Sequence, residues 1–556
     1  MSILRIVEGE MINTTTGKMD LRATDGDYTI YAAGKNRWSG GVQGIFEKDY
    51  EALHPEDSLN DTINVSLNIF FDGTQNNKTN TYEGSGYKNS NKENDSYTND
   101  YTNIARGYDA VNPNEPFHEK LYIEGIGTED LEKDDVFPDV AVGMGSHGVV
   151  AKAVKACIKA PAVLEKYKNK RIDVLVVNVY GFSRGAAAAR HFLHIANSPS
   201  LIYTYQPENK AQIMAPGYYE GMKDGDSQFN VSNCPLLQKH GFFAACLVRN
   251  KFKIDKIDFN FVGLYDTVAS HGFYHGNDVE DLHLNIGKKV HFVLQLSADD
   301  EYRENFDLTN IKSSGLHGLE LTLPGVHSDI GGSYVNEAEE ISVLYHKRES
   351  LYNKTIHHSD EEVQKLKKIV INEGWFQKHQ IESGSFSKSD FEPKKVKKGS
   401  VEDLEKFYAV VGTRKLYNTF DQIPLNLMFH FSKDKGVKYD PNLEKKHKIE
   451  DSFIETISHK LSRYVNACND LRNSNIEMYK GNLVDKESID YDYLWKLKKL
   501  SYWDYLDLET LQKLRNQYLH WSVRANEMGL GGRESQAPSK EGALEEKYRK
   551  REIHNG

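Results

Sequence analysis

A chain of 556 residues is long enough to bury a large core, and it carries 27% charged residues with a formal net charge of −11. This acidic balance argues against sequence-independent binding to nucleic acid, which needs a cationic surface. The four cysteines form no CxxC pair, so we expect neither a zinc knuckle nor a disulfide framework, and the composition fits a reducing cytoplasm.

The N-terminal part shows no signal that would explain export. Residues 1–10 lack the apolar stretch of an ordinary signal peptide, and no window of the chain is apolar over the length that spans a bilayer. We predict a small β-rich segment over residues 1–60, because Met19 to Ala32 alternates between apolar and polar residues and Gly34 to Gly44 is rich in turn residues. If this protein acts outside the cell, another machine must export it.

From residue 61 the chain alternates between apolar strands and helices. The clearest strand is the nearly unbroken apolar run Ile172 to Tyr180, which is typical of a parallel strand buried on both faces. Further strands are expected at Ile63 to Phe71, Leu121 to Glu124, Ile257 to Tyr265, Lys289 to Leu296 and Leu319 to Leu323, with helices at Gly148 to Tyr167 and Gly185 to Ile195 and a surface loop at Gln75 to Asn99. This alternation predicts an α/β fold with a mostly parallel sheet flanked by helices.

After Tyr334 the charge density rises and helical spacing dominates. Helices are expected at Glu361 to Ile371, Val401 to Tyr408, Phe453 to Leu471 and Leu508 to Tyr518, with a short apolar segment at Leu425 to Phe431. We therefore predict an α/β core over residues 61–335 and a mainly helical cap or appended module over residues 336–556.

The pentapeptide Gly181-Phe182-Ser183-Arg184-Gly185 carries the strongest chemical signal. The pattern GxSxG is common by itself, but here it follows a buried strand directly and opens onto an Ala-rich helix, as a nucleophile elbow requires. Gly181 and Gly185 would let the strand and the helix pass closely, and the helix N-terminus would favour negative charge near Ser183. We predict that Ser183 is a nucleophile; the alternative is a glycine-bounded turn with an incidental serine.

A serine nucleophile needs a base, and the base needs a carboxylate that orients it. In α/β hydrolases these residues follow later strands in the order Ser, acid, His. Asp266 and His327 each follow a predicted strand, so we predict the triad Ser183, Asp266 and His327. An N-cap role for Asp266 and a surface-loop position for His327 are the alternatives, and the rival bases are His271, His275 and His520.

Acyl transfer also needs amide donors for the developing oxyanion. One donor is expected from Arg184, the residue after the nucleophile, and the other from Gly73 or Thr74, in the turn after an earlier strand. A plain turn at Asp72-Gly73-Thr74 is an equal alternative.

Two metal-binding alternatives stay open in the sequence. Asp72, Thr74, Asn76 and Glu83 have the spacing of an EF-hand loop, although Asn77 replaces the glycine that such loops need. Asp266, His327 and Asp329 would form a metal phosphoesterase site, but this hypothesis leaves the serine elbow without a purpose. We therefore expect no metal and no cofactor.

Several motifs together resemble a known family. Over about residues 63–335 they are similar, in kind and order, to those of the α/β hydrolases that include the type VI secretion lipase effectors of the first family: Phe71-Asp72-Gly73-Thr74, Thr102-Asn103-Ile104-Ala105-Arg106, Gly125-Ile126-Gly127-Thr128, Gly181-Phe182-Ser183-Arg184-Gly185-Ala186, Asp266-Thr267-Val268 and Gly325-Val326-His327-Ser328-Asp329-Ile330-Gly331-Gly332. A weaker similarity continues in Pro424-Leu425-Asn426-Leu427-Met428 and His520-Trp521-Ser522.

The resemblance implies a serine phospholipase with Ser183, Asp266 and His327 as its triad. It also implies secretion into the envelope of a rival bacterium, a secretion spike or carrier as partner, and a cognate immunity protein. The composition break near Ser58 and the missing signal peptide make residues 1–60 a candidate docking segment. The helical part is a candidate cap that admits lipid through Leu425 to Phe431 or through Tyr502, Trp503 and Tyr505; the alternative is that both segments are buried in the core of the helical module. The alternatives are a non-catalytic binding module with the same fold, or a carboxylesterase that acts on soluble esters.

Overall fold

The computed structural model describes most of the chain from residue 62 onward. The N-terminal segment 1–60, including the predicted β unit, lies outside the described residues. The described ranges are 62–88, 90, 96–135, 148–198, 202–205, 210–213, 228–230, 235–269, 278–348, 361–391, 398–399, 406–480, 486–525 and 551–556.

The centre of the fold is a six-stranded sheet with the order β10-β8-β7-β3-β1-β2, and all neighbouring strands are parallel. The strands are β1 (Thr62–Phe71), β2 (His118–Ile123), β3 (Arg171–Phe182), β7 (Lys253–Tyr265), β8 (Phe292–Ala298) and β10 (Gly318–Leu323). All six predicted strands are present, with ends that differ by a few residues. The predicted α/β class is confirmed.

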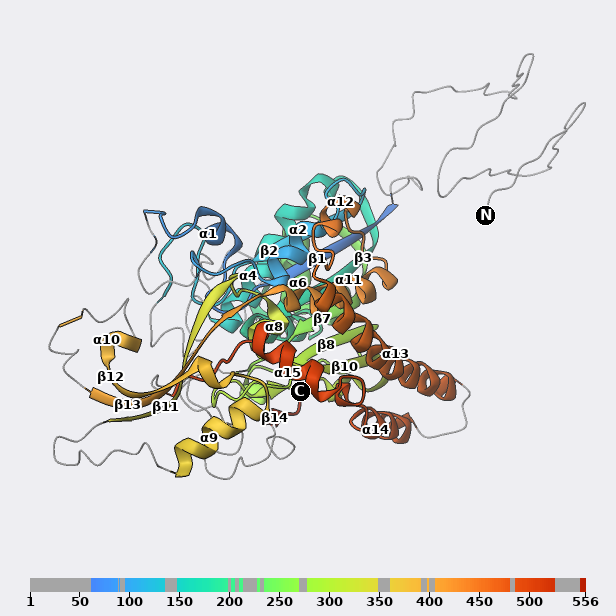
Figure 1. Ribbon diagram of the computed structural model, residues 1–556. Coiled ribbons are helices and arrows are strands. Elements are labelled where there is room, and N and C mark those ends of the chain that lie inside the picture. Colours follow the sequence, from blue (N-terminus) through green and yellow to red (C-terminus); the bar gives the residue numbers. More distant parts are fainter. Residues whose placement is uncertain are drawn as a thin grey trace, which may run out of the picture.

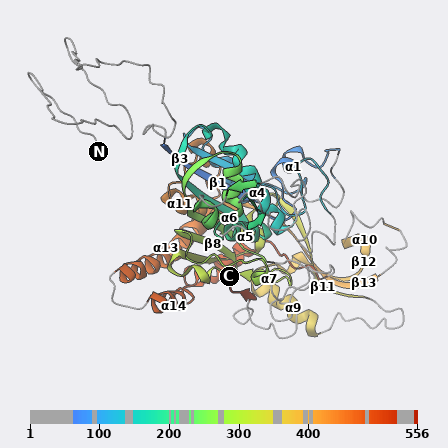
Figure 2. The same cartoon turned by 180° about the vertical axis from the view of Figure 1, so that it is seen from behind.

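Helices cover both faces of this sheet. One face packs against α4 (Val149–Leu164), α5 (Arg184–Ala196) and α6 (Pro235–Arg249), which lie together in Figure 2. The other face packs against α2 (Asn103–Ala110), α11 (Gln422–Asp434) and α13 (Ser452–Lys480), which Figure 1 shows. The alternation of β1 explains this, because Ile69 and Phe71 point to the first set of helices and Phe70 points to the second.

The strand order reverses direction at β1, which makes the carboxyl ends of β1 and β3 the expected position for a ligand. From β1 the chain goes first to β2 on one side and then to β3 on the other, and ligands of open α/β sheets bind at such a switch point. Phe71 of β1 pairs with Gly181 of β3, and Phe182 pairs with Tyr265 of β7. The residues that follow these strands, Asp72, Ser183 and Asp266, therefore leave the sheet side by side.

The C-terminal region is mainly helical, as expected, but it also contains a sheet that the sequence analysis missed. This sheet is antiparallel, in the order β11-β13-β12, with β11 (Ala338–Arg348), β12 (Ile381–Ser387) and β13 (Lys406–Leu416). The helix predicted over 401–408 is wrong in its described part, which begins β13. Residues 407–412 are buried without interruption at the centre of this sheet, so their tertiary surroundings override the helical spacing.

The C-terminal helices do not form a separate core. Leu425 and Met428 of α11 and Leu461 of α13 belong to the same buried cluster as Phe70, Tyr180 and Phe261 of the large sheet. The remaining elements are α1 (Lys78–Glu83), α7 (Asp278–Asp281), α8 (His327–Gly331), α9 (Glu361–Asn372), α10 (Lys388–Phe391), α12 (Pro441–Lys445), α14 (Lys486–Leu497), α15 (Leu508–Gln517), β4 (Ile202–Tyr205), β5 (Lys210–Ile213), β6 (Gln228–Asn230), β9 (Leu308–Thr309) and β14 (Ile553–His554). No helix within these described residues combines the length and apolarity needed to cross a membrane.

Candidate active site

Ser183 occupies a strained turn between β3 and α5. Its backbone has φ 59° and ψ −130°, a conformation that non-glycine residues rarely adopt and that costs on the order of 1–3 kcal/mol. The turn is held from both sides, because the Ser183 amide donates to the carbonyl of Tyr265 at 3.1 Å and the Ser183 carbonyl accepts from the Ala186 amide at 3.0 Å. This is the strand–turn–helix geometry of a nucleophile elbow.

The two glycines of the elbow allow the close passage that this turn needs. A Cβ atom on Gly181 would lie 2.5 Å from the Cα of Ala186, inside the first turn of α5. A Cβ atom on Gly185 would overlap the carbonyl oxygen of Asp72, directly after β1. The elbow is therefore pressed against the neighbouring strand end as well as against its own helix.

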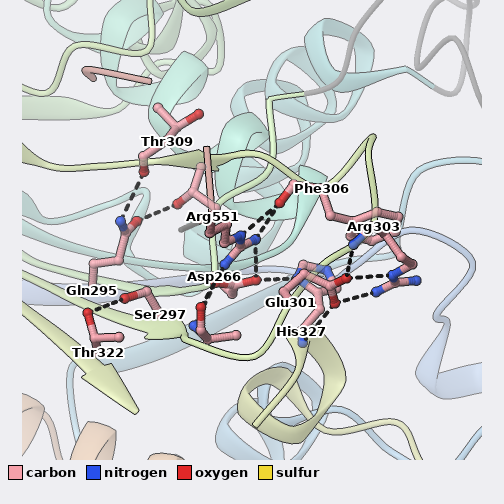
Figure 3. Close-up of polar contacts among 12 residues, drawn as sticks. Asp266, Gln295, Ser297, Glu301, Arg303, Phe306, Thr309, Thr322, His327 and Arg551 are labelled. Carbon is pink, nitrogen blue, oxygen red and sulfur yellow. Dashed lines mark hydrogen bonds and ion pairs between the residues drawn. The ribbon is translucent and has the colours of Figure 1, made fainter. Parts of the chain in front are cut away.

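Asp266 and His327 meet in a buried hydrogen-bonded pair (Figure 3). Asp266 follows β7 with φ 43°, and His327 opens α8 just after β10. The Nδ1 of His327 lies 2.6 Å from Oδ2 of Asp266, and the amide of Ala298 donates to Oδ1 of Asp266 at 2.9 Å. The His327 ring packs against Phe182 of the elbow, with 4.7 Å between ring centroids. Its Nε2 is buried and has no hydrogen-bond partner among the described residues.

The surroundings of this pair shift both pKa values downward. Burial alone would raise the pKa of the Asp266 carboxyl, but the Arg551 guanidinium and the bond from His327 hold it below its usual value. Burial lowers the pKa of His327, and this effect exceeds the opposing effect of Asp266. The pair is therefore a carboxylate and a neutral imidazole at neutral pH, as a general base requires.

Arg551 is a member of the site that the sequence analysis missed. Its guanidinium donates to both carboxylate oxygens of Asp266, at 2.5 Å to Oδ1 and 2.9 Å to Oδ2. No sequence motif marks it, because it lies 285 residues after Asp266 in the chain. Only the folded chain brings the two side chains together.

A second ion pair supports the backbone of His327. The amide of His327 donates to Glu301 at 3.2 Å, and Arg303 forms an ion pair with Glu301 at 2.8 Å. Ser522, from the C-terminal region, donates to the other oxygen of Glu301 at 2.9 Å. The histidine is thus fixed through its ring by Asp266 and through its backbone by Glu301.

The predicted oxyanion donors lie together, but they are not equivalent. Arg184 is the first residue of α5, where backbone amides have no acceptor within the helix, and its Nε donates to Oγ1 of Thr74 at 2.8 Å. The amide of Gly73 donates to the carboxylate of Asp72 at 2.7 Å. Gly73 therefore already has an acceptor, so Thr74 is the better candidate of the two for the donor that follows β1.

The rival bases have different outcomes. His271 and His275 lie outside the described residues. Nδ1 of His520 is hydrogen-bonded to Oδ1 of Asp329 at 2.7 Å. The His520 ring stacks on Tyr334, with 3.6 Å between ring centroids. Asp329 also accepts from the backbone amide of Val326 at 2.9 Å. This pair therefore fixes the start of α8, the helix that carries His327.

The side chains do not favour either metal site that the sequence left open. The Asp72 carboxyl is bound by Gly73, Thr102 and Tyr122, and burial raises its pKa to about 6, so it is a poor calcium ligand. A guanidinium already covers Asp266. Within the described part of the chain, the side chains close enough to share an ion are Asp307, Glu552 and His554, at the β9–β14 edge.

A parallel sheet with a serine at a strained strand–helix turn defines an α/β-hydrolase-like protein. The model of the family described as "T6SS, Phospholipase effector Tle1-like, catalytic domain" matches residues 66–360, and the chain belongs to this family. A search of curated proteins finds no match.

Two solved structures are similar over most of the chain. The first is the Tle1 effector bound to the VgrG spike of the type 6 secretion system, with a TM-score of 0.50, 19% identity and coverage of 89% of this chain and 94% of that chain. This likeness shows a shared fold. The second is an uncharacterized protein from Pseudomonas aeruginosa, with a TM-score of 0.34, 15% identity and coverage of 83% of this chain and 65% of that chain.

Proposed function

We propose that this effector is a serine phospholipase whose nucleophile is Ser183. The observation that carries the proposal is the strained elbow at Ser183 beside a buried His327–Asp266 pair, with the Nε2 of His327 left without a partner in the described residues. A nucleophile, a base and an orienting acid on three strand ends are the parts that acyl transfer needs.

The geometry supports the following sequence of proton transfers. His327 Nε2 takes the proton of Ser183 as its oxygen attacks the ester carbonyl, and Asp266 stabilises the imidazolium that forms. The amides of Arg184 and Thr74 bind the oxyanion. His327 then gives the proton to the departing alcohol, and water attacks the acyl-enzyme with His327 again as base.

The substrate proposed from the family is a membrane phospholipid. Of the two apolar segments considered for lipid entry, Leu425 to Phe431 is part of α11 and is used in the core, where Leu425, Met428 and Phe429 are buried. The aromatic segment is more open, since Trp503 is 38% exposed, although Tyr502 is buried and donates to Asp299. We therefore place any membrane contact of this region at Trp503 rather than at α11.

We further propose that a secretion spike delivers the protein and that a cognate immunity protein blocks it in the producing cell. The related Tle1 effector is bound to a VgrG spike in its solved structure. By this proposal the protein is secreted and acts in the envelope of a target bacterium, with residues 1–60 as the docking segment.

The test uses purified full-length protein and its Ser183→Ala variant on phospholipid vesicles and on a soluble short-chain ester. We expect free fatty acid and lysophospholipid by mass spectrometry with the wild type, and a loss of several orders of magnitude in Ser183→Ala. Turnover of the soluble ester without attack on vesicles would indicate a carboxylesterase. A wild-type protein that a fluorophosphonate probe does not label at Ser183 would be a binding module, and full activity in Ser183→Ala would refute the proposed mechanism.

A further inference from the structure

Residues 551–556 form a returning segment that docks beside the Asp266–His327 pair. Within it, β14 pairs in parallel with β9, through bonds from the Leu308 amide to the Glu552 carbonyl at 3.0 Å and from the Asn310 amide to the His554 carbonyl at 2.9 Å. Gly556 is buried, and a Cβ atom on it would overlap Arg190 and Thr309. The returning segment therefore fits closely against the core.

The strand that receives this segment is itself tied to the site. The amide of Thr309 in β9 donates to the carbonyl of Thr267, the neighbour of Asp266, at 2.9 Å. Arg190 of α5, the helix after the nucleophile, donates to the carbonyls of Thr309 and Asn310 at 3.0 and 2.7 Å. The docking place of the returning segment is thus braced by the elbow helix and by the backbone beside the acid.

Arg551 uses its whole guanidinium at this site. Besides its two bonds to Asp266, it donates to the carbonyl of Ala298 at 3.1 Å and to the carbonyl of Phe306 from Nε at 2.9 Å and Nη2 at 2.6 Å. Its side chain is 5% exposed and that of Asp266 is 0% exposed. A planar guanidinium fixed at every nitrogen sets the plane of the carboxylate that it binds.

The arrangement matters for His327, because Oδ2 of Asp266 binds both Arg551 and His327 Nδ1. Without Arg551, the Ala298 amide and the imidazole would be the donors left to the buried carboxylate among the described residues, and its charge would act on His327 without the opposing guanidinium. Among the described residues, Glu301 and Arg303 also act on the charge of His327, and they form their own ion pair.

From this geometry we propose that Arg551 is a positioning residue of the triad: the returning segment carries it to Asp266, where it fixes the carboxylate that orients His327. The proposal rests on the proposed serine mechanism. It differs from a purely structural role, because the charge of Arg551 also limits how strongly Asp266 favours the imidazolium. Removal of Arg551 should therefore change the protonation of His327 as well as the rate.

The test is a pH series of kcat/KM for the full-length wild type, Arg551→Ala and Arg551→Lys on a soluble chromogenic ester. Ile553→Ala is the matched control, because Ile553 lies in the same segment and is 52% exposed. In Arg551→Ala we expect at least about a tenfold loss at neutral pH and an acid limb moved to higher pH. Arg551→Lys keeps the positive charge, so its acid limb should stay at the wild-type pH while the plateau of kcat/KM is lower. Ile553→Ala should match the wild type.

Two further measurements separate this proposal from folding effects and from the proposed function. Millimolar guanidinium should restore part of the activity and the original acid limb to Arg551→Ala, which a structural defect would not allow. NMR titration of His327 should show a raised pKa in Arg551→Ala, whether or not Ser183 is the nucleophile.

Activity that persists in Ser183→Ala would refute the proposed function alone. A folded Arg551 variant with the wild-type profile and an unchanged pKa of His327 would refute the role of Arg551. If Arg551→Ala does not fold, the plateau of kcat/KM in Arg551→Lys decides: a plateau below that of the wild type supports the role of Arg551, and a wild-type plateau refutes it.

Discussion

Two histidine–aspartate pairs lie close together in this site, and their surroundings distinguish them. His327 has one ring nitrogen on Asp266 and the other without a partner in the described residues, with its ring against the elbow. His520 is held between Asp329 and the ring of Tyr334. The first pair has the arrangement of a base, whereas the second fixes the helix that carries this base.

The pH dependence of kcat/KM tests this distinction between His327 and His520. Only the neutral ring of His327 can accept the Ser183 proton, so activity should fall as the pH drops through the pKa of His327. Burial holds this pKa below its ordinary value, so the acid limb should lie below the range of an exposed histidine. A pH series with a soluble ester should give the same limb in His520→Gln as in the wild type. A limb that shifts or disappears in His520→Gln would point to His520 as the base.

At the scale of single residues, the sequence predicted the site residues that follow strands of the central sheet, but not the one that the distant C-terminal part of the chain contributes. The structure brings Asp266 and His327 together, and it places Ser183 on the next strand end. Their chain order and their positions after apolar runs supplied this information. Arg551 has neither signal, because its role depends on β14 pairing with β9, and Arg551 lies 285 residues after Asp266 in the chain.

The close packing of the turn between β3 and α5 requires glycine at two positions. Gly181 and Gly185 are needed because α5 crosses both its own strand and the end of β1 at distances that exclude a methyl group. The opposing atoms at Gly185 belong to the backbone of Phe71 and Asp72, and backbone in a paired strand cannot move aside as a flexible side chain can.

Gly185→Ala should therefore destabilise the protein and move Ser183 out of line. We expect a cost of about 1–3 kcal/mol from overpacking and about a 10²-fold loss in kcat/KM from misplacement of the nucleophile. Thermal unfolding and ester hydrolysis measure the two effects. Gly384→Ala in β12 is the matched control, since a Cβ atom there meets nothing within 4 Å. Wild-type stability and activity in Gly185→Ala would contradict the close contact between Gly185 and the backbone of Asp72.

At the scale of elements, the sequence predicted the central sheet well and the C-terminal sheet not at all. The six parallel strands are continuous apolar runs, because both faces of each are covered by helices. Strands β11 and β12 carry many exposed or half-buried polar residues, so they lack such a run. Only the first residues of β13, 406–408, were predicted as helix; the strand is buried without interruption over residues 407–412 and shows no alternation there.

Over the whole molecule, side chains of the C-terminal region bind acidic residues around the Asp266–His327 pair. The three acidic residues after β8 are each bound from this region: Asp299 by Tyr502, Asp300 by Arg515 and Glu301 by Ser522. Asp266 is bound by Arg551 in the same way. The site thus draws on residues from the turn after β1 to Arg551, just before β14, and the shared core connects the large sheet to the C-terminal helices.

Residues 1–60 are the docking segment in the proposed function, so export should depend on them. In the proposed division of labour residues 1–60 dock and the later residues carry Ser183, Asp266 and His327, so deleting residues 1–60 should leave ester hydrolysis intact while abolishing export. The measurement compares full-length and truncated protein in the medium of secreting cells and, after purification, on a soluble ester. Full-length Ser183→Ala serves as the control, because it should be exported without being active. Equal export of the truncated protein would place the docking surface within residues 61–556, and loss of its hydrolytic activity would mean that the N-terminal segment supports the catalytic core.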